Sequence, residues 1–186
     1  LSETCHKYGL YLFLDGARLG YGLAAPDNDL TLPEIAALCD VFYIGGTKVG
    51  ALFGEAVVIK NPELAQDFRY LIKQNGGMLA KGRLLGLQFD ALFTDGLYQE
   101  ISAHAIAMAE KLREAFTAKG YTYLAPNRTN QIFVIVPDAH LAKISEQFEY
   151  SYDQRIDATH SCVRFCTGWA TREENVDALI RCVEKL

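Results

Sequence analysis

The sequence has no cluster of basic residues and no long hydrophobic run. Its 186 residues carry a formal net charge of −5, and its 18 Lys and Arg residues are scattered. Nucleic acids and anionic membrane surfaces attract basic patches, so neither is an expected partner. The apolar runs at residues 10–14 and 41–44 are too short to cross a bilayer, and the N-terminus lacks the pattern of a signal peptide. We therefore expect a soluble, cytoplasmic protein.

The cysteines follow neither the pattern of a disulfide framework nor that of a metal site. Their number is odd, no two form a C-x-x-C pair, and no histidine stands at metal-ligand spacing. Cys162 and Cys166 would share one face of a strand, too far apart along it for an ordinary disulfide. We predict buried free thiols and no bound metal. The five residues are Cys5, Cys39, Cys162, Cys166 and Cys182.

The first half of the sequence is typical of an α/β domain. Half of all residues are hydrophobic, which is enough for a substantial core. Residues 1–8 resemble the end of an amphipathic helix, and we therefore expect the sequence to be part of a longer protein. Strands are predicted at 10–14, 41–44 and 53–59, and their apolar character favours a mostly parallel sheet that is covered on both faces.

Helix signals separate these strands and follow them. Thr31, Pro33 and Glu34 form a capping pattern before a helix at 31–38, Asn61-Pro62-Glu63 opens another, and longer helices are predicted at 78–93 and 101–118. After residue 120 the pattern changes to short strands at 121–124, 131–136 and 162–166 with helices at 139–148 and 172–186. We expect a large α/β domain at 1–95 and a small α+β domain at 96–186.

Asp15-Gly16-Ala17-Arg18 comes directly after the first apolar strand. Ligands of open α/β sheets bind outside the carboxyl ends of the strands, so this carboxylate and guanidinium would face a ligand. The ordinary alternative is a solvated ion pair at a strand end. Taken alone, this motif is a weak signal.

Lys48 follows the second strand in the turn Gly45-Gly46-Thr47-Lys48. The glycines allow a sharp turn or a close approach to a ligand. An amine that is partly removed from water can condense with an aldehyde. An exposed loop lysine is the ordinary alternative. Together with Asp15, however, Lys48 provides the two groups that pyridoxal 5′-phosphate (PLP) chemistry requires, an amine for the aldehyde and a carboxylate for the ring nitrogen.

Several motifs, in order, resemble those of the threonine aldolases and aromatic amino acid β-eliminating lyases, PLP enzymes of fold type I. They are LFLDGARLGYGL, the Thr47-Lys48 pair, Gly76-Gly77-Met78 before a helix, Thr129-Asn130-Gln131 before a strand, and VRFCTGWATREENVD. The resemblance implies the C-terminal part of the large PLP-binding domain followed by the small C-terminal domain.

The resemblance also implies residue roles. Lys48 would form the Schiff base with PLP, Asp15 would pair with the ring nitrogen, and Thr47 would bind the phosphate. Arg18 would contact the cofactor and the substrate carboxylate, which Arg164 would also bind. Arg164 stands in an apolar strand, where burial without an anion is costly; the alternative is the solvated face of an edge strand.

The sequence departs from the family pattern at two places. Leu79 stands where the family usually has a phosphate-binding arginine, so Lys81 or Arg83 would replace it, unless both are surface charges. Thr167-Gly168-Trp169 stands where Thr-His is frequent. The residue that stacks on the ring and the main phosphate loop precede the aspartate in this fold, and so lie outside this sequence.

The expected activity is cleavage of a β-hydroxy amino acid to glycine and an aldehyde by the full-length enzyme, with this part inactive when expressed alone. β-Elimination and transamination are alternatives within the same fold, and a non-catalytic α/β module is an alternative of another class. The resemblance implies an amino acid substrate and a homodimer or homotetramer.

Overall fold

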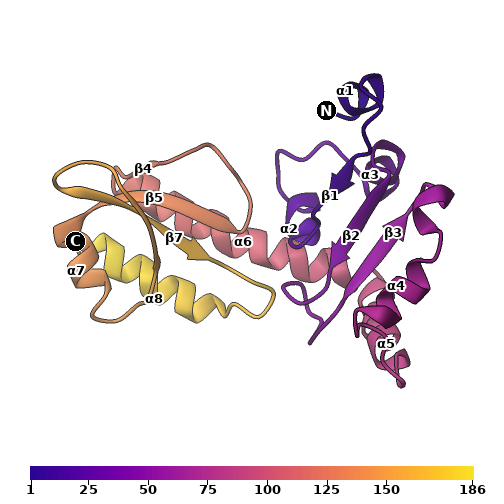
Figure 1. The fold of residues 1–186 in the computed structure, drawn as a ribbon. Helices are drawn as coiled ribbons and strands as arrows, with labels where there is room; N and C mark the ends of the chain where they lie inside the picture. The colour runs from indigo at the N-terminus through magenta and orange to yellow at the C-terminus, as the bar shows by residue number, and fades with distance from the viewer. The chain divides into compact units, whose positions relative to one another are not determined.

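The computed structural model describes residues 1–186, which divide into two compact units (Figure 1). The first unit comprises residues 1–23 and 28–100, and the second comprises residues 24–27 and 101–186. Helix α6, Leu97–Ala118, contributes residues 97–100 to the first unit and its remainder to the second. Each unit contains one β-sheet, so each can be described by itself.

The first unit has a three-stranded sheet in the order β1-β2-β3, with β1 at Phe13–Leu14, β2 at Val41–Gly45 and β3 at Glu55–Ile59. β1 is parallel to β2, and β3 is antiparallel to it. The parallel pair places the carboxyl ends of β1 and β2 at the same edge of the sheet. The α/β class predicted from the sequence is confirmed, although only one of the two strand pairings is parallel.

In the first unit, two helices connect β1 to β2, one precedes β1, and three follow β3. α3 begins with the predicted capping box, in which the backbone N–H and the hydroxyl of Thr31 both donate to Glu34. Phe42 of β2 is buried, as are Tyr21 and Val49. The helices are α1 (Ser2–Lys7), α2 (Leu19–Leu23), α3 (Leu32–Leu38), the 3₁₀ helix η1 (Pro62–Ala65), α4 (Phe68–Gln74) and α5 (Arg83–Phe93).

The strand predicted at 53–59 begins only at Glu55, and two further elements of the first unit are also shorter than predicted. The strand expected at 10–14 is reduced to two residues, because the backbone N–H of Leu12 donates to the Asp40 carboxylate at 2.7 Å instead of to a neighbouring strand. The helix expected from residue 78 begins at Arg83, after a turn in which Gly82 is the N-cap. Glycine is tolerated at an N-cap but disfavours a helix interior, which explains the later start.

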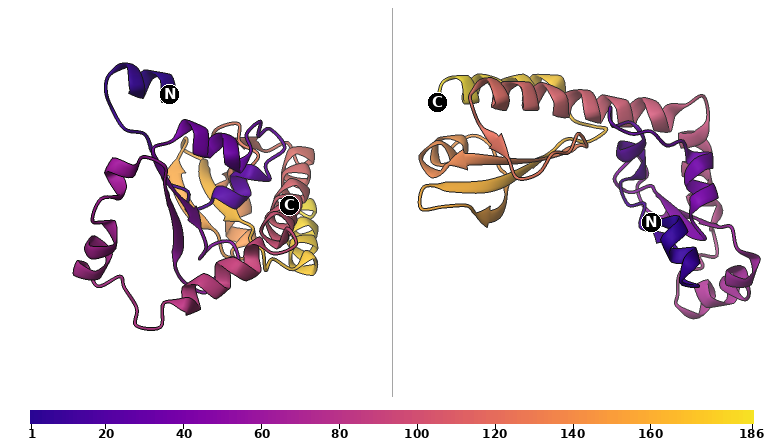
Figure 2. Two further views of the ribbon diagram at one scale, coloured as in Figure 1. Left: turned by 90° about the vertical axis from the view of Figure 1, so that its right-hand side faces the viewer. Right: turned by 90° about the horizontal axis from the view of Figure 1, so that it is seen from above.

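The second unit is an antiparallel four-stranded sheet in the order β4-β5-β7-β6. Its core contains Phe116 of α6, Val134, Val163 and Val183, all buried. Figure 2 shows α6 and α8 side by side along the sheet. The elements are β4 (Thr122–Tyr123), β5 (Gln131–Pro137), α7 (Asp138–Ile144), β6 (Ser151–Arg155), β7 (His160–Cys166) and α8 (Glu173–Glu184).

All five cysteines are free. Cys39 and Cys162 are buried as predicted, but Cys5 and Cys182 are only partly buried, and Cys166, the last residue of β7, is exposed. No three His, Cys, Asp or Glu side chains lie together in a way that could hold a metal ion. None of the helices combines the length and the apolar character needed to span a membrane.

Candidate functional site

The segment that follows β1 contacts the end of β2 at two glycines, Gly16 and Gly45. The Gly45 N–H donates to the Gly16 carbonyl at 2.9 Å. A Cβ at Gly16 would lie 1.7 Å from the Tyr43 carbonyl oxygen, and a Cβ at Gly45 would lie 2.5 Å from the Ala17 carbonyl oxygen. Only residues without a side chain permit this approach. The Asp15 segment and the turn that carries Lys48 are therefore packed against each other.

Tyr98 of α6 is hydrogen-bonded to both of these parts of the chain. Its hydroxyl accepts the Gly20 N–H at 3.0 Å and donates to the Gly45 carbonyl at 3.1 Å. The ring is 1% exposed and stacks on Phe93 with centroids 5.2 Å apart. Burial raises the pKa of Tyr98 to about 12, so the hydroxyl stays protonated and keeps both bonds.

The Asp15 carboxylate is exposed and held on one side. Its Oδ1 accepts the Tyr43 hydroxyl and the Ala17 N–H, the latter at 3.1 Å. Oδ2 accepts no hydrogen bond from the protein. The Tyr43 hydroxyl, the Ala17 N–H and the charges of Lys48 and Arg18 lower the pKa of Asp15. The carboxylate is therefore anionic at neutral pH, with one oxygen available to a ligand.

Lys48 projects from a fixed turn into solvent. The Tyr21 hydroxyl donates to the Lys48 carbonyl, and the next residue, Val49, is fully buried. Glu55 of β3 accepts the Gly46 N–H at 2.7 Å and the Thr47 hydroxyl at 3.3 Å. The backbone of the turn is thus bound on both sides, while the Lys48 side chain is exposed and makes no ion pair.

The remaining residues predicted for this site do not form one group in the first unit. Arg18 is half-buried and acts electrostatically on Asp15, and its guanidinium has no hydrogen-bond or ion-pair partner. Thr47 lies in the Lys48 turn, but its hydroxyl is directed to Glu55. Lys81 lies in the turn before α5, Arg83 is the first residue of that helix, and both side chains are exposed. No hydrogen bond or ion pair joins either residue to the Asp15 and Lys48 segments.

Four residues of this arrangement, Tyr21, Tyr43, Glu55 and Tyr98, were not predicted from the sequence. Tyr43 and Glu55 bind Asp15 and the Lys48 turn, respectively, and each stands in a strand. The signal for Tyr43 was its polar group in an otherwise apolar strand. The signal for Glu55 was weaker, since a charged first residue is common in strands near a turn.

Arg164 lies in the second unit, on β7, opposite Phe133 of β5. Its guanidinium donates to the Gln131 side-chain oxygen at 3.3 Å, and its Nε is buried without a hydrogen-bond partner. The side-chain oxygen of Asn130 is also buried and unpartnered. A buried donor of a charged group without a partner is rare in a folded protein, and an anionic ligand would satisfy it.

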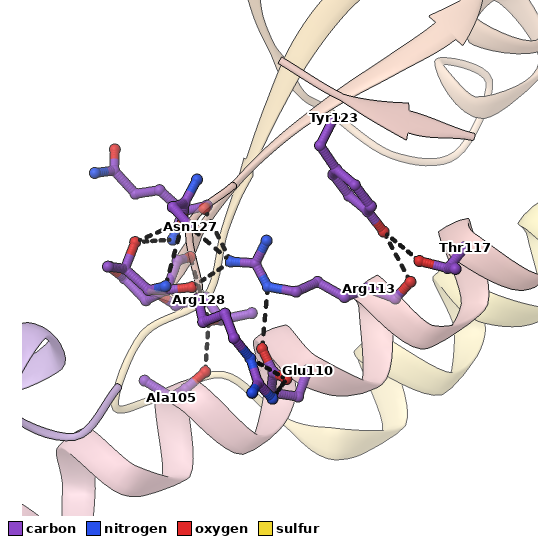
Figure 3. A network of polar contacts seen from close by, with 11 residues as sticks. Ala105, Glu110, Arg113, Thr117, Tyr123, Asn127 and Arg128 are labelled. Atoms are coloured by element: carbon purple, nitrogen blue, oxygen red, sulfur yellow. Dashed lines mark hydrogen bonds and ion pairs between the residues drawn. The ribbon is translucent and has the colours of Figure 1, made fainter. Parts of the chain in front are cut away.

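A network of polar contacts fixes the loop before β5, which carries Asn130, and the first residue of β5, Gln131 (Figure 3). Arg113 of α6 donates to the carbonyl oxygens of Thr129 at 2.6 Å and Gln131 at 3.2 Å, and pairs with Glu110. The Thr167 hydroxyl, just beyond β7, donates to the Ala105 carbonyl at 2.6 Å. The start of β5 and the end of β7, which lie opposite each other in the antiparallel pair, are therefore both bound to α6.

Comparison with known proteins identifies the family. The family model described as β-eliminating lyase matches residues 1–139. The chain belongs to the β-eliminating lyase family. This β-eliminating lyase chain is 31% identical over 183 residues to the low specificity L-threonine aldolase of Pseudomonas sp. (strain NCIMB 10558), which covers 96% of this chain and 51% of that protein.

Solved structures agree with the family match. The structure of Leishmania major threonine aldolase is 42% identical, with a TM-score of 0.96, and the match covers 99% of this chain and 54% of that one. A putative L-allo-threonine aldolase from Listeria monocytogenes, 24% identical with a TM-score of 0.74, has the same fold. This β-eliminating lyase chain therefore spans about half the length of the relatives it matches.

Enzymes of this β-eliminating lyase family depend on PLP. The groups of the first unit fit that cofactor. Asp15 has an anionic carboxylate with a free Oδ2 for a protonated ring nitrogen, and Lys48 has a free amine for an aldehyde. Both belong to segments that glycine contacts hold together.

Proposed function

We propose that the complete protein uses PLP to cleave a β-hydroxy-α-amino acid into glycine and an aldehyde. Family membership and the threonine aldolase relatives support this proposal. The observation that carries it is the packing of the Asp15 segment against the Lys48 turn, which brings a carboxylate and an amine to adjacent strand ends. The activity is assigned to the complete protein because the chain spans about half of its relatives.

Lys48 would hold the cofactor covalently through its amine, and Asp15 would pair with the ring nitrogen. PLP, when bound, supplies a ring that accepts the electron pair released as a bond to the substrate's α-carbon breaks. Asp15 favours that chemistry because its carboxylate, anionic at neutral pH, keeps the ring nitrogen protonated. Thr47 would bind the phosphate after its hydroxyl turns from Glu55, and Lys81 is the second candidate for that group.

Arg18 and Arg164 are the proposed ligands of the substrate carboxylate. Each has a guanidinium with unused donors, and a guanidinium can bind a carboxylate through two parallel hydrogen bonds. Such a clamp would fix the orientation of the substrate's α-carbon, which decides which of its bonds breaks. For cleavage, the β-hydroxyl loses its proton, the Cα–Cβ bond breaks to release the aldehyde, and a proton returns to Cα to give glycine.

The decisive experiment combines adduct mapping with product analysis. The complete protein, mixed with PLP and reduced with borohydride, is expected to carry the cofactor on Lys48 in a peptide map. Lys48→Ala should lose the visible absorption band of the bound cofactor, whereas Lys73→Ala, which changes an exposed lysine of α4, should keep it. Retention of the band in Lys48→Ala would refute the assignment.

Product analysis with L-threonine then identifies the reaction. Glycine and acetaldehyde support the proposal. Ammonia with a keto acid would indicate β-elimination, the reaction in the family's name, and an exchanged amino group would indicate transamination. If the complete protein binds no PLP, the chain is a non-catalytic α/β module in which the motifs are structural.

We also propose that the protein is a cytoplasmic homodimer or homotetramer. Several apolar side chains of α4 and α5 are exposed, among them Leu71 at 47%, Leu84 at 52% and Leu87 at 57%, and a second copy of the chain would cover them. The five free cysteines suit a reducing compartment.

A further inference from the structure

Tyr43 stands beside Asp15 because of the register of the parallel strands. Phe13 pairs with Val41 and Leu14 with Phe42, so the residue after β1 lies next to Tyr43 on β2. The Tyr43 hydroxyl donates to Asp15 Oδ1. The Tyr43 ring packs against Phe13 with centroids 6.1 Å apart, which limits the positions that the hydroxyl can take.

The hydrogen bonds to Asp15 are unequal between its two oxygens. Oδ1 accepts both the Tyr43 hydroxyl and the Ala17 N–H, while Oδ2 accepts neither. Two donors at one oxygen, from the strand and from the turn, define the rotation of the carboxylate plane. The free oxygen is consequently the one that can meet a ligand.

We propose that Tyr43 is a positioning residue, whose hydroxyl fixes the Asp15 carboxylate so that Oδ2 meets the ring nitrogen of PLP. This inference rests on the proposed function, because it concerns the same cofactor. It assigns to a residue outside the recognised motifs the orientation of the group that keeps the ring nitrogen protonated. Tyr43 itself touches Asp15 and not the reacting atoms.

The charged groups around Asp15 come from two turns and one strand. Lys48 and Arg18 are cations that favour the ionised carboxylate. The negative charge of Glu55 on β3 raises the pKa of Tyr43. The Tyr43 hydroxyl has a larger effect on the pKa of Asp15 than either cation. Removing that hydroxyl should therefore raise the pKa of Asp15, so that acid protonates it more readily.

The test uses Tyr43→Phe in the complete protein and measures the Kd of PLP over a pH series. Phenylalanine keeps the ring and its contact with Phe13, so the fold should be preserved, which the unfolding midpoint checks. PLP binding at neutral pH is expected to weaken about tenfold, because a carboxylate without this bond must be fixed in place when PLP binds, which uses part of the binding free energy. The acid limb of the affinity profile should move to higher pH.

The matched control is Tyr70→Phe, which removes the hydroxyl of a tyrosine that is 74% exposed on α4. Its Kd and its acid limb should equal those of the wild type. If Tyr43→Phe also equals the wild type in Kd, Asp15 needs no such anchor. If its Kd rises but its acid limb stays, the role of Tyr43 is merely structural. Either result overturns the inference.

The outcome separates this inference from the proposed function. Failure of the wild type to bind PLP would overturn the proposed function and the role of Tyr43 with it. Binding by the wild type with no response to Tyr43→Phe would leave the proposed function standing and refute only the role of Tyr43.

Discussion

The geometry of the candidate site depends on two glycines and one tyrosine. Gly16 and Gly45 permit a contact that any Cβ would block, and the Tyr98 hydroxyl joins the segments from behind. Asp15 and Lys48 are more visible in the sequence, but their positions depend on these three residues. The positions of the carboxylate and the amine therefore depend on uncharged residues that have no reactive group.

Asp157 has the most strongly perturbed carboxyl, and it stabilises the hairpin that carries Arg164. Its Oδ1 accepts the N–H groups of Thr159 at 2.7 Å and His160 at 2.8 Å. The Thr159 N–H and the His160 side chain lower the pKa of Asp157 from 3.8 to about 2. A carboxyl whose pKa is lower in the folded state stabilises the fold above its unfolded pKa, and this stabilisation disappears as the pH falls through the folded pKa.

We expect Asp157→Asn to lower the midpoint of thermal unfolding at neutral pH. The difference from the wild type should be constant above about pH 5 and should shrink as the pH falls from about 4 to 2. Thermal unfolding followed by circular dichroism over this range measures it. A difference that is independent of pH would show that ionisation of Asp157 contributes nothing to the hairpin.

Much of the site could be anticipated from the sequence, and the reasons for the gaps are physical. Asp15 and Lys48 each follow an apolar strand, and neighbouring strands of an α/β sheet end at one edge. The partners Tyr43 and Glu55 depend on register, which fixes which residues of different strands are adjacent. Register follows from packing, so the sequence pattern alone did not show these contacts.

At the scale of elements, apolar strands and capped helices were predicted well, and polar elements were not. β6 was missed because all five of its residues, Ser151–Arg155, are exposed, and an edge strand of this kind has no hydrophobic alternation. α2, at Leu19–Leu23, was not predicted, because two glycines interrupt it. The boundaries of β1 and α5 were wrong for the local reasons given above.

Arg113 stabilises the start of β5 and the loop before it. Arg113→Met should remove the donors for the Thr129 and Gln131 carbonyls and lower the free energy of unfolding by about 2 kcal/mol. Arg128→Met, which removes an exposed arginine paired with the same Glu110, should cost less than about 1 kcal/mol. Urea denaturation of both variants measures the difference, and equal losses would mean that the carbonyl contacts are unimportant.

The position of the exposed apolar surface on the folded chain cannot be predicted from the sequence. The helical pattern of residues 83–93 shows which side chains are apolar, but burial depends on which elements pack against them. Leu84 and Leu87 remain exposed although α5 packs through Leu92, which is buried. The pattern predicted a helix, and only the structure shows which face has no neighbour within this chain.

Leu87→Glu should shift the complete protein to a smaller assembly. A charge in an apolar interface is costly, because the interface would bury it without a partner. Gln147→Glu adds the same charge at an exposed position after α7, outside α4 and α5, and should leave the assembly unchanged. Sedimentation velocity at several concentrations distinguishes the two variants, and an unchanged sedimentation coefficient in Leu87→Glu would exclude this face from the interface.

The contact between Gly16 and Gly45 has a consequence for how such sequences vary. At both positions the obstructing atoms are backbone carbonyls, Tyr43 for Gly16 and Ala17 for Gly45, so no exchange of a neighbouring side chain can make room. A substitution in one motif cannot be compensated in the other. Homologues that keep this spacing between carboxylate and amine must retain both glycines. The glycine pair is therefore a stricter criterion than the charged residues for recognising sequences that have this site.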